Sequence, residues 1–303
     1  MSANDTRILV TGASGYVGRL LSRRLHSEGG RVRAMARRPE QLAQDGGIQV
    51  VYGDVLVPDS LGKALEGIGA AYYLVHSMGA GPRYAQRDRE GATNFARAAR
   101  EAGVGKIIYL GGLGSGDSLS AHLASRQEVG RILKDSGVPT LEFRAAVVIG
   151  AGSLSFEMVR ALVERLPIMV TPRWVRTPTQ PIAADDLLDY LIAALDPGSP
   201  SEGVFEIGGA DQTSYLGIMK EYARQRGLKR AFIPVPVLTP SLSSLWLKLV
   251  TPLHARVGRE LIEGVRNPTV VEDQSALEAF SVRPMGIQEA LARASETQVS
   301  PSR

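Results

Sequence analysis

Three glycines, Gly12, Gly15 and Gly18, follow the apolar run Ile8–Val10 with the spacing G-x-x-G-x-x-G. A strand that enters a helix through such a turn can bind a pyrophosphate, because glycine permits the tight turn and the close approach of backbone N–H groups. The N-terminus of the helix then offers unpaired N–H donors to the anion. The pattern predicts a dinucleotide site. The contacts expected from this turn are Gly12, Ser14, Gly15, Tyr16, Val17 and Gly18.

The end of the second expected strand indicates which dinucleotide binds. An NAD site commonly places a carboxylate there to bind the ribose 2′-hydroxyl. The segment Met35–Pro39 has no carboxylate and instead contains Arg37 and Arg38. Two guanidinium groups suit the 2′-phosphate of NADP through charge-assisted hydrogen bonds. The sequence therefore predicts NADP, with a solvated basic turn as the alternative.

Two further strand ends are expected to contribute cofactor contacts. Residues after the third strand are placed to contact the adenine, and residues after the fourth to line the inner side of the cofactor. His76 and Ser77 could equally be simple loop residues. The predicted contacts are Gly53, Asp54, Val55, Val75, His76 and Ser77.

The elements that must position these residues alternate between short β-rich runs and helical patterns, which predicts βαβ units on a parallel sheet. The clearest helix is Tyr84–Ala102, which Gly103 should end. We expect an α/β fold, a doubly wound parallel sheet of the Rossmann type, with its ligand crevice beyond the carboxyl ends of the strands. The expected strands are Arg7–Val10, Arg31–Ala36, Ile48–Tyr52, Ala71–Val75, Lys106–Leu110 and Thr140–Val148.

The second half of the chain is expected to be a smaller region that covers the substrate. We predict an NADP-binding domain at 1–152 with 183–207 packed back on it, a mostly substrate-binding region at 153–295, and a disordered tail at 296–303. The expected elements are helices at Ser155–Arg165, Asp185–Leu195, Tyr215–Arg226 and Ser241–Val250, a strand at Val204–Ile207 and an irregular loop with short strands at Leu166–Pro181. The amphipathic helix Ser241–Val250 could pack, form a lid or contact a membrane surface. Candidate apolar pocket residues are Phe156, Met158, Met169, Trp174, Trp246 and Leu249.

Composition narrows the classes of function. The 303 residues include no cysteine, which excludes disulfides, thiolate nucleophiles and cysteine-bound zinc. The 35 basic and 31 acidic residues are well interspersed, which argues against a nucleic-acid partner. No apolar run is long enough to span a bilayer, and no metal-ligand motif or G-x-S-x-G elbow occurs. We expect a cytoplasmic monomer or homodimer that takes a small-molecule substrate, without stable membrane insertion or a metal.

The motifs resemble the short-chain dehydrogenase/reductase superfamily, specifically its atypical members near the NmrA-like, triphenylmethane-reductase-like and epimerase/dehydratase-like branches. The matching segments are TGASGYVG from Thr11 to Gly18, Gly53–Val55, Gly91–Ala96, Lys106–Leu113, Arg144 with Val147–Gly150, and Gln180–Ile182 with Asp186. The resemblance extends over about residues 5–270. It implies the Rossmann fold and NAD(P)H binding.

The chain departs from this family at the catalytic positions. Typical members use a serine after the fifth strand and a Tyr-x-x-x-Lys on the next helix, whose tyrosine protonates the substrate. Here Gly111 or Gly112 occupies the place of the serine, and His122 with Arg126 is the nearest equivalent of the tyrosine and lysine. Residues at i and i+4 share one helical face. His122 is thus a candidate proton donor near neutral pH and Arg126 a candidate cofactor contact, unless both belong to a surface helix.

Together these observations predict an NADPH-dependent oxidoreductase that transfers a hydride to a small apolar carbonyl, quinone-like or conjugated acceptor. One alternative is a catalytically degenerate NADP(H)-binding redox sensor or complex subunit, which the missing serine and tyrosine favour. A second alternative is an NADP-dependent epimerase or dehydratase.

Overall fold

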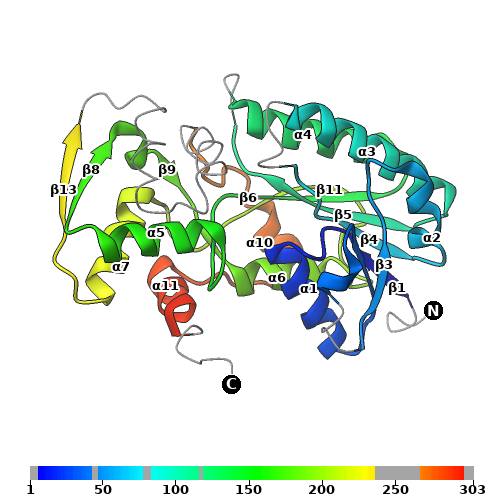
Figure 1. Ribbon diagram of the computed structural model, residues 1–303, viewed down its shortest axis with the longest axis horizontal. Coiled ribbons are helices and arrows are strands. Elements are labelled where there is room, and N and C mark those ends of the chain that lie inside the picture. Colours follow the sequence, from blue (N-terminus) through cyan, green and yellow to red (C-terminus); the bar gives the residue numbers. More distant parts are fainter. Residues whose placement is uncertain (1–5, 43–46, 78–82, 116–118, 236–266, 297–303) are drawn as a thin grey trace.

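The centre of the molecule is a parallel sheet with the strand order β11-β6-β5-β4-β1-β2-β3 (Figure 1). The computed structural model describes residues 6–42, 47–77, 83–115, 119–235 and 267–296. The seven strands are β1 (Arg7–Val10), β2 (Arg31–Ala36), β3 (Gln49–Tyr52), β4 (Ala70–Tyr73), β5 (Lys106–Gly112), β6 (Thr140–Ala145) and β11 (Gly203–Ile207). The strand order reverses between β1 and β4, and ligands of open α/β sheets bind at such a switch point. The predicted fold class is confirmed.

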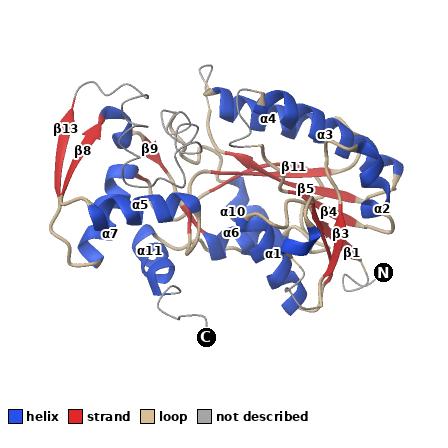
Figure 2. Ribbon diagram, in the orientation of Figure 1, coloured by secondary structure: helices blue, strands red, loops and turns tan. Residues whose placement is uncertain are grey.

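Helices cover both faces of this sheet (Figure 2). One face carries α1 (Tyr16–Ser27), α6 (Ala184–Ala193) and α10 (Ser275–Ala279), and the other carries α2 (Leu61–Leu65), α3 (Tyr84–Glu101) and α4 (Ala121–Lys134). Successive strand residues point to opposite faces. Thus Ile8 and Val10 enter the hydrophobic cluster under α1 and α6, whereas Leu9 enters the cluster under α2 and α3.

Several strand boundaries differ from those predicted. Ile48 precedes β3, and β4 ends at Tyr73, so Val75 lies in a loop. β5 continues to Gly112, two residues beyond the predicted end. The predicted strand Thr140–Val148 is divided into β6 and the short β7 (Val148–Ile149). The predicted strand Val204–Ile207 is β11, which pairs in parallel with β6 and extends the sheet.

The second half of the chain adds a third hydrophobic cluster beside the sheet. Its main elements are α5 (Leu154–Arg165), β8 (Ile168–Pro172), α7 (Tyr215–Gln225), β13 (Ala231–Val235) and α11 (Ile287–Glu296). Shorter pieces are β9 (Pro178–Thr179), β10 (Ile182–Ala183) and β12 (Thr213–Ser214). Single 3₁₀ turns are η2 (Pro39–Gln41), η3 (Pro58–Ser60) and η4 (Arg173–Arg176). The segment Leu166–Pro181, predicted to be an irregular loop with short strands, contains the short strands β8 and β9 and the turn η4.

The predicted pocket residues of this region have a different role. Phe156 and Met169 are fully buried in the third cluster, and Met158 and Trp174 pack against it. None of these four side chains lines the cavities described below. Their hydrophobicity reflects core packing, because α5, α7 and β8 bury it against one another. The predicted helix Ser241–Val250, with Trp246 and Leu249, lies outside the described residues, as does 297–303.

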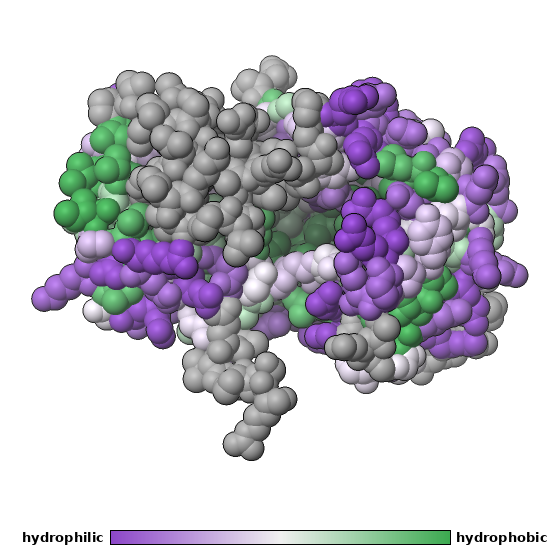
Figure 3. All heavy atoms as spheres, in the orientation of Figure 1, coloured by the Kyte–Doolittle hydropathy of each residue, from purple (hydrophilic) through white to green (hydrophobic). Residues whose placement is uncertain are grey.

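The face drawn in Figure 3 is mainly polar with several local apolar areas. Ile168 on β8 and Ile233 on β13 are 57% and 48% exposed. Figure 3 is green at its left edge, on the side where Figure 1 shows β8 and β13. None of the described helices combines the length and the hydrophobicity that a membrane crossing requires.

Candidate cofactor and active site

A cavity of about 840 Å³ opens where β1, β2, β3 and β4 end. Each of these strands contributes lining residues just after its last position: Gly12, Arg37, Gly53 and Leu74. Its volume is within the usual range for small-molecule and cofactor sites. The carboxyl ends of parallel strands meet at one edge, so segments far apart in the sequence converge there.

The glycine turn forms one wall of this cavity. Gly12 has a φ of +62°, and a Cβ atom on Gly18 would lie 2.3 Å from the carbonyl oxygen of Gly12. The backbone N–H of Gly15 donates to the Gly12 carbonyl at 2.9 Å, which closes the turn. Helix α1 then begins at Tyr16 without a side-chain cap. Its first N–H groups are therefore available to an anion, so the turn fits a dinucleotide diphosphate.

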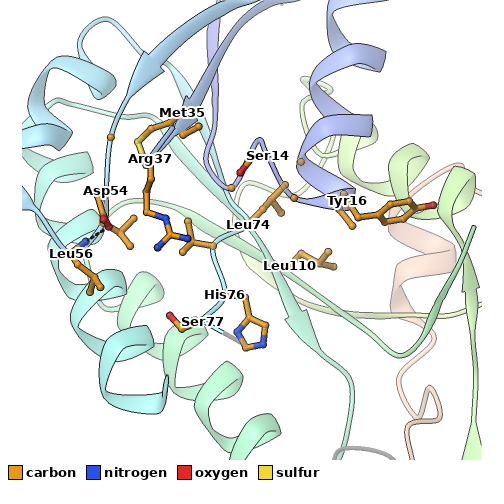
Figure 4. Close-up of a pocket in the computed structure, with 18 of the residues that line it drawn as sticks. Ser14, Tyr16, Met35, Arg37, Asp54, Leu56, Leu74, His76, Ser77 and Leu110 are labelled. Atoms are coloured by element: carbon orange, nitrogen blue, oxygen red, sulfur yellow. Dashed lines mark hydrogen bonds between the residues drawn. The ribbon is translucent and has the colours of Figure 1, made fainter. Parts of the chain in front are cut away.

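Most predicted cofactor residues meet in this cavity, and Figure 4 shows several of them around it. They are Gly12, Ser14, Gly15, Tyr16, Val17, Gly18, Arg37, Gly53, Asp54, Val55, Val75, His76 and Ser77. Arg126, predicted on a separate argument, lines it too. Arg38 is exposed one residue beyond Arg37 and is not part of the lining. The roles of these residues remain predictions.

Besides Arg126, two cationic side chains line the cavity from different elements. Arg37 follows β2, and Arg87 lies on α3. Arg87 was missed by sequence reasoning, because nothing in its spacing relates it to the glycine turn. Asp54 is less free to bind a ligand, since its Oδ1 accepts a hydrogen bond from the Leu56 N–H at 2.9 Å.

A second cavity of about 300 Å³ adjoins the first. The two share the lining residues Tyr16, Val17, His76, Leu110 and Arg126, which we call the junction. Beyond the junction, the lining is mainly aliphatic or small. It includes Gly111, Gly112, Leu113, Leu123, Ala145, Ala146, Val147, Val148 and Leu154, together with the polar Ser153, Ser155, Tyr215, Thr269 and His122.

The glycines at the place of the family serine are explained by close packing. A Cβ atom on Gly112 would lie 2.9 Å from Cδ2 of Leu123 and 3.2 Å from Cδ of Arg126. A Cβ atom on Gly111 would lie 2.7 Å from Oε1 of the buried Glu142. A serine at either position would push α4 or Glu142 away. The absence of the serine is thus coupled to the packing of α4 against β5.

Arg126 is held at the junction by the end of β5. Its guanidinium donates a hydrogen bond to the Leu110 carbonyl and lies 5.8 Å from the centre of the Tyr109 ring. The Tyr109 hydroxyl in turn donates to the Arg126 carbonyl at 2.9 Å. These contacts hold a permanent positive charge between the two cavities.

Tyr16 is another junction residue. Burial, with Asp185 and Glu157 nearby, raises the pKa of Tyr16 to about 12, so this junction phenol stays protonated.

His122 lines the second cavity near Arg126. Burial, with the charge of Arg126, lowers its pKa to about 3. The ring is therefore neutral at pH 7 and can act there as a hydrogen-bonding group rather than as a charged acid. Its buried Nδ1 has no hydrogen-bond partner among the described residues.

A second histidine, His76, forms part of a hydrogen-bonded group that the sequence analysis missed. Its Nδ1 lies 3.2 Å from Oδ2 of Asp88, and its ring centroid lies 4.8 Å from that of His122. Asp88 is 5% exposed and also accepts hydrogen bonds from the Ser77 N–H and the Ser125 hydroxyl. Burial raises the pKa of Asp88, but the interactions with His76 and Ser77 outweigh it and leave the pKa below its ordinary value. A carboxylate one helical turn before Ala92, on the apolar face of α3, was the available signal.

Comparisons with known proteins agree with this geometry. Residues 12–161 match the family described as NAD(P)H-binding. Over 176 residues the chain is 33% identical to the (4-alkanoyl-5-oxo-2,5-dihydrofuran-3-yl)methyl phosphate reductase of Streptomyces griseus, covering 55% of this chain and 59% of that protein. It is 27% identical over 278 residues to the ceramide reductase of Caulobacter vibrioides, covering 86% of each. The chain spans less than two thirds of the first of these relatives.

Two solved structures have the same fold over almost the whole chain. The triphenylmethane reductase of Citrobacter sp., complexed with NADP(H), matches with a TM-score of 0.76 and 19% identity, covering 95% of this chain and 99% of that one. The NADPH-dependent quinone oxidoreductase of Escherichia coli, complexed with NADPH, matches with a TM-score of 0.74 and 18% identity, covering 94% and 98%.

Proposed function

We propose that this chain, whose residues 12–161 match the family described as NAD(P)H-binding, is an NADPH-dependent oxidoreductase of the atypical short-chain dehydrogenase/reductase type. Its substrate is a small apolar carbonyl, quinone-like or conjugated acceptor. The observation that carries the proposal is the junction, at which a cavity sized for a cofactor meets a smaller, mostly apolar one. The names of the two sequence relatives, both reductases, support the same class of reaction.

The glycine turn and the N-terminus of α1 would hold the diphosphate of NADPH. Arg37, which lines the cavity, would bind the 2′-phosphate. The adjacent Arg38 lies outside the lining. The junction would hold the nicotinamide end of the cofactor. When bound, NADPH supplies a hydride, while the protein supplies position and electrostatics. Hydride transfer depends strongly on the orientation of the acceptor.

Residues of the second half would cover the acceptor. Ser153, Leu154, Tyr215 and Thr269 line the second cavity from α5, α7 and the segment after 267, which supports a substrate-covering role for this region. Apolar lining favours a neutral acceptor without its own phosphate, because desolvating a phosphate there would be costly. Arg126 and the neutral imidazole of His122 are the groups placed to orient an acceptor oxygen by hydrogen bonding.

The main competing function is that of a protein that binds NADP(H) without turnover. It is favoured by the absence of the family serine, whose place at Gly111 or Gly112 is packed closely against Glu142 and Leu123. An epimerase or dehydratase is less favoured, because such enzymes usually retain the missing tyrosine.

The experiment is a comparison of binding with turnover. NADPH binding is measured by calorimetry, and NADPH consumption is followed at saturating cofactor with quinones, enones and aliphatic ketones. Binding with turnover of at least one class supports the reductase. NADPH binding without turnover of any of the three acceptor classes favours the protein that only binds NADP(H). Absence of NADPH binding rejects both functions. The control is a Gly18→Val variant, in which the new side chain fills the glycine turn and should weaken NADPH binding. Circular dichroism checks that this variant is folded.

A further inference from the structure

We propose that His76, oriented by Asp88, is the proton donor at the junction of the two cavities. This assignment rests on the proposed reductase function and adds to it the acid that the missing tyrosine would have supplied. It places the acid on the loop after β4, instead of on the helix α4 where the family carries it.

The position of His76 is the first argument. It lines both the cofactor cavity and the acceptor cavity, and its side chain is only 14% exposed. Of the other titratable junction residues, Tyr16 has a pKa raised to about 12, and arginines such as Arg126 remain protonated. His76 is therefore the junction residue whose side-chain type, an imidazole, is suited to proton transfer.

The fixed geometry of Asp88 is the second argument. Its Oδ1 accepts the Ser77 N–H at 2.9 Å, while its Oδ2 lies 3.2 Å from Nδ1 of His76 and 3.3 Å from the Ser125 hydroxyl. These contacts come from the β4 loop and from α4, so the carboxylate has one orientation. A buried carboxylate on one ring nitrogen selects the tautomer and stabilises the imidazolium.

The other charged or titratable groups around His76 either disfavour a positive charge on its ring or do not affect it. His122 on α4 is neutral at pH 7, so it does not repel an imidazolium although the two rings are 4.8 Å apart. Arg126 on α4 and Arg87 on α3 are positive and disfavour the charged ring. The phenol of Tyr16 on α1 is neutral. Asp88, in direct contact, favours the imidazolium.

A carbonyl acceptor would receive one hydride and one proton. The hydride and its electron pair add to the carbonyl carbon, and NADPH leaves as NADP⁺. Nε2 of His76 is buried in this structure, so the step requires a small shift of the ring or its neighbours that brings Nε2 to the bound acceptor. The C=O π bond then opens, and its electron pair takes the proton from Nε2 of His76. The product is an alcohol, and the neutral imidazole, still bonded through Nδ1–H to Asp88, regains a proton from solvent.

The first test uses the cofactor-free protein and no activity. The chain has four histidines, so each imidazole can be followed by NMR titration and assigned by single substitutions. We expect the midpoint of His76 to fall by about one pH unit or more in Asp88→Asn, because the carboxylate charge is lost. The exposed His26 should not move and serves as the control. An unchanged His76 midpoint would overturn the proposal.

The second test uses turnover with the best acceptor of the panel. His76→Gln should lower kcat by about 100-fold or more, with NADPH affinity changed less than threefold. His26→Gln should match the wild type. Asp88→Asn should lower kcat and shift the loss of activity at high pH to lower pH. Wild-type turnover that survives His76→Gln overturns this assignment alone, whereas binding without any wild-type turnover overturns the reductase function together with it.

Discussion

A Cβ atom on Gly12 would lie 2.6 Å from the carbonyl oxygen of Leu74, 62 positions along the chain. The two residues follow the neighbouring parallel strands β1 and β4. Thr11 connects the same loops, because its hydroxyl donates to the Tyr72 carbonyl and accepts the Leu74 N–H. The glycine turn is thus fitted to the loop that carries His76, so the proposed diphosphate site and the proposed proton donor share one support.

Replacing Gly12 should therefore damage the fold as well as cofactor binding. We expect Gly12→Ala to lower the free energy of unfolding by about 2 to 4 kcal/mol, from the left-handed backbone and the contact with Leu74. Urea unfolding measures the effect. A Cβ atom on Gly62 of α2 would have no neighbouring atom within 4 Å, so Gly62→Ala should be neutral or stabilising. Equal losses in both variants would contradict the packing argument.

Selectivity for NADPH should depend on Arg37. Arg37→Ala should raise the Kd for NADPH about 10-fold to 100-fold and leave that for NADH within about threefold, because a charged hydrogen bond to phosphate contributes about 1.5 to 3 kcal/mol. Calorimetry with both cofactors tests this. The neighbouring Arg38 lies outside the cavity lining, so Arg38→Ala is the matched control with a smaller effect. Equal weakening of NADPH and NADH by Arg37→Ala would reject the phosphate contact.

The buried ion pair between Arg144 and Glu142 should be sensitive to removal of one partner. Arg144 Nε donates to Glu142 Oε1 at 2.8 Å, and the glutamate side chain is 5% exposed. Arg144→Met leaves a buried carboxylate unpaired, which should cost about 3 to 5 kcal/mol of unfolding free energy.

The double variant Glu142→Gln/Arg144→Met should recover a large part of that loss. Arg224→Met, which breaks the more exposed pair with Glu221, should cost less than about 1 kcal/mol. Chemical denaturation of the four proteins gives the comparison. A double variant no more stable than Arg144→Met would show that charge burial is not the cause.

The pH dependence of stability should reveal the lowered pKa of His122 in the folded protein. Its pKa in the folded protein is about 3, below the ordinary value of 6.5, so the unfolded chain binds more protons between these values. The contribution of His122 to stability is therefore fully present above pH 6.5 and is lost as the pH falls toward 3.

The slope due to one such group is at most about 1.4 kcal/mol per pH unit. We expect His122→Gln to be less dependent on pH than the wild type between pH 6.5 and 4, as measured by urea unfolding at fixed ionic strength. Parallel curves for the two proteins would mean that the imidazole titrates alike in the folded and unfolded chain.

The local patterns of the sequence were sufficient for the sheet and the glycine turn. Short β-rich runs and the G-x-x-G-x-x-G spacing depend on residues close together in the chain, and so β1, the helix that follows it and the location of Arg37 could be predicted. Strand ends were less accurate, since the division of Thr140–Val148 into β6 and β7 depends on pairing with β10.

The apolar residues of the second half show the limit of such reasoning. Phe156, Met158, Met169 and Trp174 have the composition of a pocket wall, yet they pack in or against the third cluster. Hydrophobicity is equally suited to a core and to a pocket. Only the arrangement of α5, α7 and β8 determines which of the two is realised.

By itself, the sequence determined a doubly wound NAD(P)H-binding fold and the identity of most cofactor-cavity residues, because those signals are local. The tertiary structure determined which residues meet at the junction and around it. It brought His76 from the β4 loop, Asp88 from α3 and His122 from α4 together, lowered the pKa of His122 by burial, and left no room for a serine at Gly111 or Gly112. Burial and contacts between distant segments arise only when the chain is packed, so no spacing in the sequence encodes them directly.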